Sequence, residues 1–309
     1  KWSQQGKTTA DVLKKSIAFG RESARAVMQW SATDSPGHQG YLYNYDRNYH
    51  PPVGAGKWKP GGEHPMPALL PYWGKIRRFA TWTDTIGVLP PISYDTIPGS
   101  SYHTEALEVF TISQNLSKES HWIAEFWSDD IEGLTLTPSG RWIKITNQAM
   151  EKTDVPFTVV LETYLMIGWA LNDAAVTCWI GKYGHNVQRP EDYINDNIHP
   201  GWKPLHDSPS FPAYPSGHSA FGAAAAEILT SQLGENFSIT DRTHIRRQEF
   251  AGKPRTYNGF REMALENAAS RLYLGVHFRM DCTEGLRIGK KVGQNMLSIR
   301  LKKDELAGK

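Results

Sequence analysis

The segment 153–183, TDVPFTVVLETYLMIGWALNDAAVTCWIGKY, restricts most strongly how this chain can fold. It is long and apolar enough to raise the question of a membrane span. Glu162, Asn172 and Asp173 interrupt it, however, and the rest of the chain offers no partner span. We therefore expect a helix in the core of a folded protein, without a membrane span and with Pro156 in the first helical turn.

Helical periodicity of apolar residues recurs along most of the chain. It predicts further helices at about 9–30, 101–113, 117–129, 218–233, 257–274 and 280–301, whereas 31–98 is rich in Pro, Gly and Tyr and is typical of long irregular structure. No strand-rich region, repeat or low-complexity tract is visible. We expect a single all-α domain of packed bundles over 1–309, with helices and long loops in 1–150 and the functional helical bundle in 151–309.

Three glycines recur every four residues in the last predicted helix, at Gly285, Gly289 and Gly293. Residues at this spacing share one face of a helix. The stripe predicts that another backbone approaches this face closely, which is a packing feature and not a chemical one.

Charge and cysteine content exclude several classes of protein. The formal net charge is +2 over 309 residues, so nucleic-acid binding is not expected and any anion site must be a local cluster. Cys178 and Cys282 cannot build a disulfide framework or a CxxC metal site. We expect two free buried thiols, with a single bridge as the alternative.

The stretch KYGHNVQRP, residues 182–190, presents two cations. Gly184 favours the end of a helix, which would place Lys182 on the last turn. Arg189 precedes Pro190 and is therefore pushed out of helical geometry into a loop. This pair suits one small oxyanion, although a solvated basic helix end would give the same pattern.

The stretch FPAYPSGHSAFGAAAAEIL, residues 211–229, opens a helix with a Ser-Gly-His triplet. A helix start carries unpaired N–H groups and a partial positive charge, and it attracts anions. The Ser216 hydroxyl and the Gly217 amide can donate hydrogen bonds, and His218 can pass a proton near neutral pH. The alternative is a Ser N-cap followed by an unrelated His.

The stretch SRLYLGVHFRMD, residues 270–281, combines Arg, His and Asp. Arg271 and His277 would lie on different faces of an ideal helix, but Gly275 can break the helix between them and let both aim at one point. Asp281 follows His277 by four residues, near enough to accept a hydrogen bond from one ring nitrogen and keep the other unprotonated. A purely structural Asp–His hydrogen bond is the alternative.

In this order, the three stretches resemble the signature of the superfamily of type 2 phosphatidic acid phosphatases and vanadium-dependent haloperoxidases: KX6RP, PSGH and SRX5HX3D. Every signature position matches, and the resemblance extends from about residue 121 to the end. It implies two four-helix bundles with the metal site at the end of the second. It also implies that one cradle holds the oxygens of phosphate or vanadate, built from Lys182, Arg189, Arg271, Ser216 and Gly217.

Three features outside the signature resemble the haloperoxidases rather than the phosphatases. Phe211 and Trp179 stand where aromatic residues of that group shape the approach of the halide. The segment FWSDDIEGLTLTPSGRW resembles a haloperoxidase segment in which Asp130 would pair with an active-site Arg. The chain is most similar to the vanadium-dependent iodoperoxidases of marine flavobacteria, and ordinary core packing is the alternative for the two aromatic residues.

The resemblance implies a vanadate cofactor with His277 as the protein ligand of vanadium, Asp281 as the residue that orients it and His218 as the acid–base group. Hydrogen peroxide, bound side-on to the vanadate, would oxidise iodide to hypoiodous acid, which could pass to an organic acceptor where one exists. A secreted or periplasmic location is also implied. The alternatives are a bromide-preferring haloperoxidase, an acid phosphatase acting through a phosphohistidine and, more remotely, a non-catalytic helical binding protein.

Overall fold

The computed structural model describes residues 6, 8–38, 40, 44–61, 65–80, 85–129, 131, 133–249 and 253–301. The helices are α1 (Ala10–Ser31), η2 (Trp73–Lys75), α2 (Ser101–Gln114), α3 (Lys118–Phe126), α4 (Pro138–Glu151), α5 (Phe157–His185), α6 (Pro190–Asn197), α7 (Gly217–Leu233), α8 (Phe260–Leu274) and α9 (Arg279–Leu297). Two short antiparallel pairs join β1 (Tyr45–Asp46) to β2 (Ala68–Leu69) and β3 (Ile239–Asp241) to β4 (Arg255–Tyr257). The all-α prediction is confirmed.

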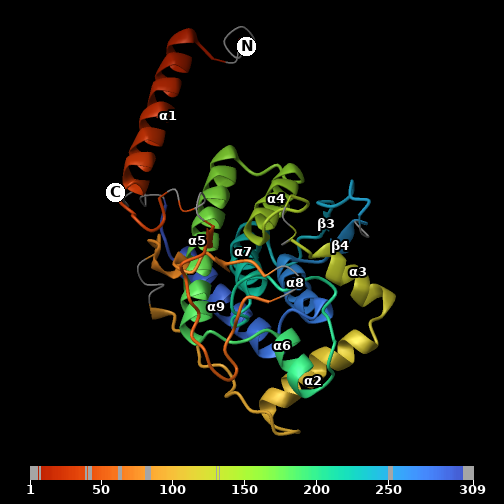
Figure 1. Ribbon diagram of the computed structural model, residues 1–309. Helices are drawn as coiled ribbons and strands as arrows, with labels where there is room; N and C mark the ends of the chain where they lie inside the picture. Colours follow the sequence, from red (N-terminus) through yellow and green to blue (C-terminus); the bar gives the residue numbers. More distant parts are fainter. Residues whose placement is uncertain are drawn as a thin grey trace.

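Helix α7 lies at the centre of the bundle, and α4, α5, α8 and α9 all pack against it (Figure 1). Every residue of α7 from Gly217 to Thr230 is buried. Its run of alanines suits this place, because Ala favours a helix and its small side chain lets neighbouring helices approach. Helix α3 lies on α8, and α2 lies on α6 and α8.

The glycine stripe of α9 forms the contact with α7, as its spacing predicts. A methyl group added at Gly285 would collide with the carbonyl oxygen of Ser216, and one added at Gly289 would collide with that of Ala220. The two backbones therefore touch where α7 begins. This close approach also fixes the start of α7 relative to the start of α9.

Replacing Gly289 with Ala is expected to lower the free energy of unfolding by about 2–3 kcal/mol, because the new methyl group meets the backbone of Ala220. Urea unfolding measures the change. Gly168→Ala on the exposed face of α5 is the matched control, since nothing lies within 4 Å of its added methyl group. The control should gain up to about 1 kcal/mol from helix propensity. Equal losses in the two variants would contradict close α7–α9 packing.

Helix α5 is the core helix that segment 153–183 predicts. It is long and apolar enough to cross a membrane by length and composition, but it packs against α4, α7 and α9, and half of its most apolar window is buried. Both ends differ from the prediction. Pro156 is the N-cap, directly before the helix, and does not lie in its first turn. Gly184 lies within the helix, which continues to His185, and Asn186 adopts the left-handed conformation at the C-cap (φ 53°). Asn tolerates this conformation, so it takes the role expected of the glycine.

The α-helices α4 and α6 were not predicted. Helix α4 begins with the Thr137 side chain accepting a hydrogen bond from the Gly140 amide, and Pro138 occupies its first turn. Helix α6 begins at Pro190 directly after Arg189. Both starts carry the proline that favours a first helical turn.

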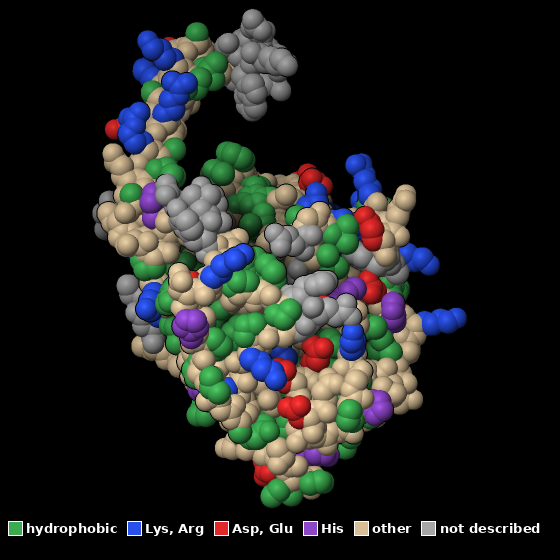
Figure 2. Space-filling model, in the orientation of Figure 1, with side chains coloured by type: hydrophobic (Ala, Val, Ile, Leu, Met, Phe, Trp, Pro, Cys, Tyr) green, Lys and Arg blue, Asp and Glu red, His purple; other side chains and the backbone are tan. Residues whose placement is uncertain are grey.

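Helix α1 projects from the rest of the molecule, and none of its residues is buried (Figure 1). Apolar and basic side chains lie together along it (Figure 2). Its last turn contacts the body, where the Arg77 guanidinium lies 4.4 Å from the centre of the Trp30 ring and that ring lies 5.4 Å from Phe79.

Candidate oxyanion-binding site

Helix ends bring the three sequence stretches to one end of the bundle. Lys182 lies on the last turn of α5, Arg189 lies directly before α6, and Ser216 caps α7. Arg271 lies on the last turn of α8. The stretches are also joined through the backbone, because the Ser216 amide donates to the Asp281 carbonyl at 2.9 Å.

The two cations of the first stretch are buried and held by backbone carbonyls. Lys182 Nζ donates to the carbonyls of Pro212 and Ala213 at 2.9 and 3.0 Å. Arg189 donates through Nε to the Phe211 carbonyl at 3.0 Å and through Nη1 to the Val276 carbonyl at 2.8 Å. These contacts connect the first stretch to the other two, so the solvated-helix-end alternative does not apply.

The third stretch folds as its spacing predicts. Gly275 ends α8 with a φ of +82°, a conformation that favours glycine. The chain then turns so that His277 Nδ1 lies 2.9 Å from Asp281 Oδ2, which also accepts the Phe278 amide at 3.0 Å. Because Nδ1 faces a carboxylate, it carries the ring proton, and Nε2 keeps its lone pair. Arg189 Nη1 lies 3.3 Å from this Nε2.

The electrostatics of the site keep His277 neutral. Burial lowers the pKa of His277 well below its ordinary value, and the positive charges of Arg189, Lys182 and Arg271 lower it further. Burial raises the pKa of Asp281, against the opposing effects of Lys182 and the Phe278 amide. A neutral imidazole that faces three cations can donate its lone pair to an electrophilic centre that carries negative oxygens.

The second stretch supplies the start of α7. The Ser216 side chain accepts a hydrogen bond from the Ser219 amide at 3.4 Å, so Ser216 is the N-cap. Gly217 and His218 form the first turn, and all three residues are buried. His218 is close enough to His277 to contribute to the lowering of its pKa. The positive end of α7 therefore adds to the charges of the cations near His277.

The carboxylate expected to pair with an active-site Arg is that of Asp130. Asp130 lies outside the described residues. Its neighbour Asp129 is buried and bonds to Arg141, with 2.9 Å between Oδ1 and Nη1. Arg271 Nη1 donates to the carbonyl of Trp127 at 3.3 Å, so the same segment does reach the site.

Trp179 and Phe211 pack together beside the cations, with ring centres 5.2 Å apart. The Phe211 ring lies under both cations, 4.6 Å from Lys182 Nζ and 5.0 Å from the centre of the Arg189 guanidinium. Both aromatic side chains are buried. They thus form an apolar wall against the cationic centre.

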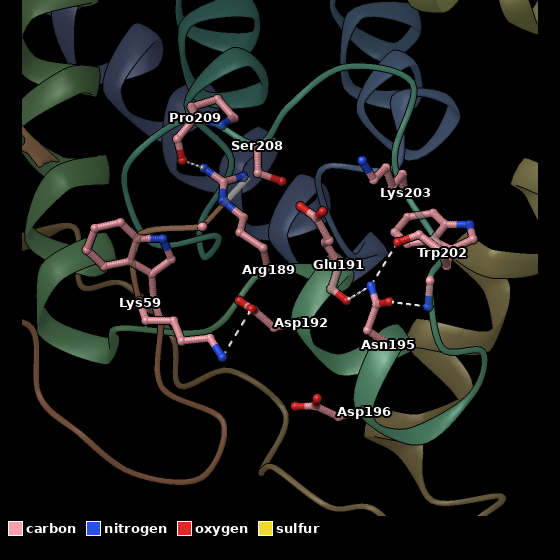
Figure 3. Close-up of a pocket in the computed structure, with 13 residues that line it drawn as sticks. Lys59, Arg189, Glu191, Asp192, Asn195, Asp196, Trp202, Lys203, Ser208 and Pro209 are labelled. Carbon is pink, nitrogen blue, oxygen red and sulfur yellow. Dashed lines mark hydrogen bonds and ion pairs between the residues drawn. The ribbon is translucent and has the colours of Figure 1, made fainter. Parts of the chain in front are cut away.

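Two cavities reach the cations from outside. One, of about 320 Å³, ends at Arg189 (Figure 3). Glu191 points its carboxylate between Arg189 and Lys203 in this cavity, and Lys59 pairs with Asp192 at 3.7 Å.

The second cavity, of about 250 Å³, ends at Arg271. It is lined by apolar side chains together with Ser128, Asp207 and His206, and Nε2 of His206 lies 3.1 Å from Glu125 Oε1. Pro209 lines both cavities, so the segment before α7 separates them. Neither cavity was predicted, because their walls come from distant parts of the chain.

The donor set fits an oxyanion and not a free divalent cation. Within the described ranges, no group of three or more His, Cys, Asp or Glu side chains is placed to hold a metal ion. Cys178 and Cys282 are free and buried, as expected, and take no part in such a group. Positive side chains and a helix start lie instead near one neutral imidazole, an arrangement suited to a tetrahedral anion.

The chain is similar to known proteins that use vanadium. The family model described as VCPO second helical-bundle domain matches residues 162–302. Vanadium chloroperoxidase of Curvularia inaequalis is 23% identical over 320 residues, which cover 75% of this chain and 52% of the relative. The chain thus spans about half the length of that curated relative.

Solved structures extend the match to nearly the whole chain. The crystal structure of a bacterial vanadium-dependent iodoperoxidase superposes with a TM-score of 0.83 and 30% identity, covering 93% of this chain and 70% of that one. A holo-type bacterial vanadium-dependent chloroperoxidase shares the fold, with a TM-score of 0.65 and 16% identity over 81% of this chain and 64% of that one. With the signature residues assembled at one end of the bundle, these matches show that the chain belongs to the vanadium-dependent haloperoxidase family.

Proposed function

We propose that the protein is a vanadate-dependent peroxidase that oxidises iodide with hydrogen peroxide to hypoiodous acid. The observation that carries this proposal is the buried, neutral His277: its Nε2 lies 3.3 Å from Arg189 Nη1, and the charges of Arg189, Lys182 and Arg271 lower its pKa. An imidazole in this state can ligate vanadium while the cations hold the negative oxygens of vanadate.

Each part of the cradle has a separate task. Lys182, Arg189 and Arg271 would hold the vanadate oxygens, together with the Ser216 hydroxyl and the Gly217 amide. Bound vanadate would supply the electrophilic activation of hydrogen peroxide. Asp281 fixes the ring of His277 so that Nε2, and not Nδ1, faces the oxyanion.

The reaction also needs a proton. Iodide, hydrogen peroxide and one proton give hypoiodous acid and water, so each turnover consumes a proton at a buried site. His218 lies on the first turn of α7 beside the cradle and is the side chain that we assign to this transfer.

Iodide is the proposed halide because the similar bacterial structure is that of an iodoperoxidase. Chemistry supports the choice, since iodide is the halide that is easiest to oxidise. Trp179 and Phe211 would offer a polarisable wall to a large, soft anion while excluding water from the site.

A paired assay on metal-stripped protein tests the proposal. Iodide oxidation by hydrogen peroxide is followed with and without added orthovanadate, and hydrolysis of an aryl phosphate is followed with the same preparation. We expect iodide oxidation that depends on vanadate and is suppressed by excess inorganic phosphate, because both anions compete for one cradle. Bromide in place of iodide measures the halide preference.

The contrary outcomes are distinct. Rapid phosphate hydrolysis inhibited by vanadate, with negligible halide oxidation, would assign the cradle to a phosphatase. Faster bromide than iodide turnover at equal concentration would keep the vanadate chemistry and overturn the choice of halide.

A further inference from the structure

A cluster of four buried charged or titratable side chains packs against segment 126–129, at the end of α3. Arg141 on α4 donates through Nε and Nη2 to Asp241 Oδ2 at 3.0 and 2.8 Å. Its Nη1 donates to Asp129 Oδ1 at 2.9 Å and also contacts His244 Nε2. The Arg141 and Asp241 side chains are completely buried, and those of Asp129 and His244 are almost so.

The ion pair between Arg141 and Asp241 is stable although both side chains are buried. Burial alone would raise the pKa of Asp241, but Arg141 and hydrogen bonds from Thr243 and Gln148 outweigh it and leave the pKa below its ordinary value. A buried charge is costly unless it is paired and hydrogen-bonded. Arg141 is therefore tied firmly to its partners.

Arg141 also contacts the backbone and the aromatic rings of segment 126–129. Its Nη1 donates to the Phe126 carbonyl at 3.2 Å. Its guanidinium carbon lies 4.6 Å from the centre of the Phe126 ring and 4.8 Å from that of Trp127. The next carbonyl along the chain, that of Trp127, accepts the hydrogen bond from Arg271 at 3.3 Å. Phe126 and Trp127 thus connect Arg141 to Arg271 of the cradle.

We infer that Arg141 is a positioning residue for the oxyanion site: it fixes segment 126–129 so that the Trp127 carbonyl orients the Arg271 guanidinium. Orientation matters because a guanidinium binds an oxyanion through a rigid, planar fork of N–H groups, and a rotated fork loses one of two parallel hydrogen bonds. The inference rests on the proposed function only in that the site binds an oxyanion.

Arg141→Lys tests the inference, because lysine keeps the charge and loses the fork that reaches Phe126, Asp129 and Asp241 together. Equilibrium dialysis measures the binding of orthovanadate and, separately, of inorganic phosphate. We expect both affinities to fall roughly 10–100-fold, the usual effect of losing a residue that orients a ligand-holding group. Excess vanadate should restore most of the kcat for iodide, because Arg141 itself does not touch the reacting atoms.

Arg261→Met is the control variant. Arg261 lies on α8, the helix that also carries Arg271, and bonds to the buried Glu227 on α7 at 2.8 Å. Among the described residues, its hydrogen-bond partners include neither segment 126–129 nor the cradle. Its loss should lower thermal stability and leave both affinities within about twofold of the native protein, since well-separated sites act independently. Equal falls in affinity in the two variants would contradict a specific role of Arg141 and would overturn the inference.

His244→Ala keeps the test decisive if Arg141→Lys does not fold. It removes one contact of Arg141 and leaves the arginine in place, so we expect a smaller fall in both affinities with vanadate rescue. Unchanged affinity in a folded Arg141→Lys protein would contradict a positioning role. If Arg141→Lys does not fold, unchanged affinity in His244→Ala would contradict it. Native protein that binds both anions without oxidising iodide would overturn the proposed function alone.

Discussion

Replacing His277 with Ala is expected to remove vanadate binding and iodide oxidation together. Asp281 holds the imidazole of His277 through Nδ1, which leaves the Nε2 lone pair facing Arg189 Nη1 at 3.3 Å. Loss of a residue that only orients a ligand costs 10–100-fold in affinity, so loss of the ligand itself should exceed about a hundredfold. Equilibrium dialysis of orthovanadate and the iodide assay measure the two effects.

Two controls separate ligation from general damage. His103→Ala changes a partly buried histidine on α2 and should leave vanadate affinity unchanged. Free imidazole added to His277→Ala can occupy the space left by the ring and should restore part of the binding. Full vanadate-dependent iodide oxidation by His277→Ala would show that the ligand is assigned wrongly.

The parts of the site that the sequence predicts are those that local geometry decides. Asp281 follows His277 by one helical turn, and Gly275 supplies the left-handed residue that turns the chain before them. Both features depend on a few consecutive residues. The spacing therefore predicts the hydrogen bond between the two side chains without knowledge of the rest of the fold.

The parts that the sequence does not predict depend on contacts between distant segments. Arg141 and Asp241 are a hundred residues apart, and only the packing of α4 beside β3 brings them together. Nothing local marks either residue as buried. The adjacent acids of the segment WSDD raise a related difficulty, because the sequence does not show that Asp129 bonds to Arg141.

The missed helix α4 is different, since a signal was present. Trp142, Ile145 and Ala149 are buried at a helical spacing of three and four, behind a threonine N-cap and a proline. The preceding Gly, Thr and Pro residues favour a loop and concealed this start. The prediction for α5 differs from the structure at both ends: Pro156 is the N-cap and not part of the first turn, and Asn186, not Gly184, ends the helix.

Replacing His218 with Ala is expected to lower kcat for iodide roughly 10²–10⁴-fold while vanadate affinity stays within a few-fold. His218 lies at the start of α7, near His277, but the cradle is built from other groups. The backbone carbonyl of His218 accepts a hydrogen bond from Asn267, and this bond does not depend on the imidazole ring. Each turnover consumes one proton, so without His218 the proton must come from water or buffer. The iodide assay across pH and vanadate dialysis measure both quantities.

The pH dependence tells proton delivery from binding. With the imidazole gone, the remaining turnover should rise as the pH falls, because hydronium and buffer acids replace the missing donor. His218→Gln offers hydrogen bonds without a titratable proton, so it should retain vanadate and stay as slow as His218→Ala. Loss of vanadate in step with activity in both variants would instead make His218 part of the cradle, since a group that only moves protons leaves the resting affinity intact.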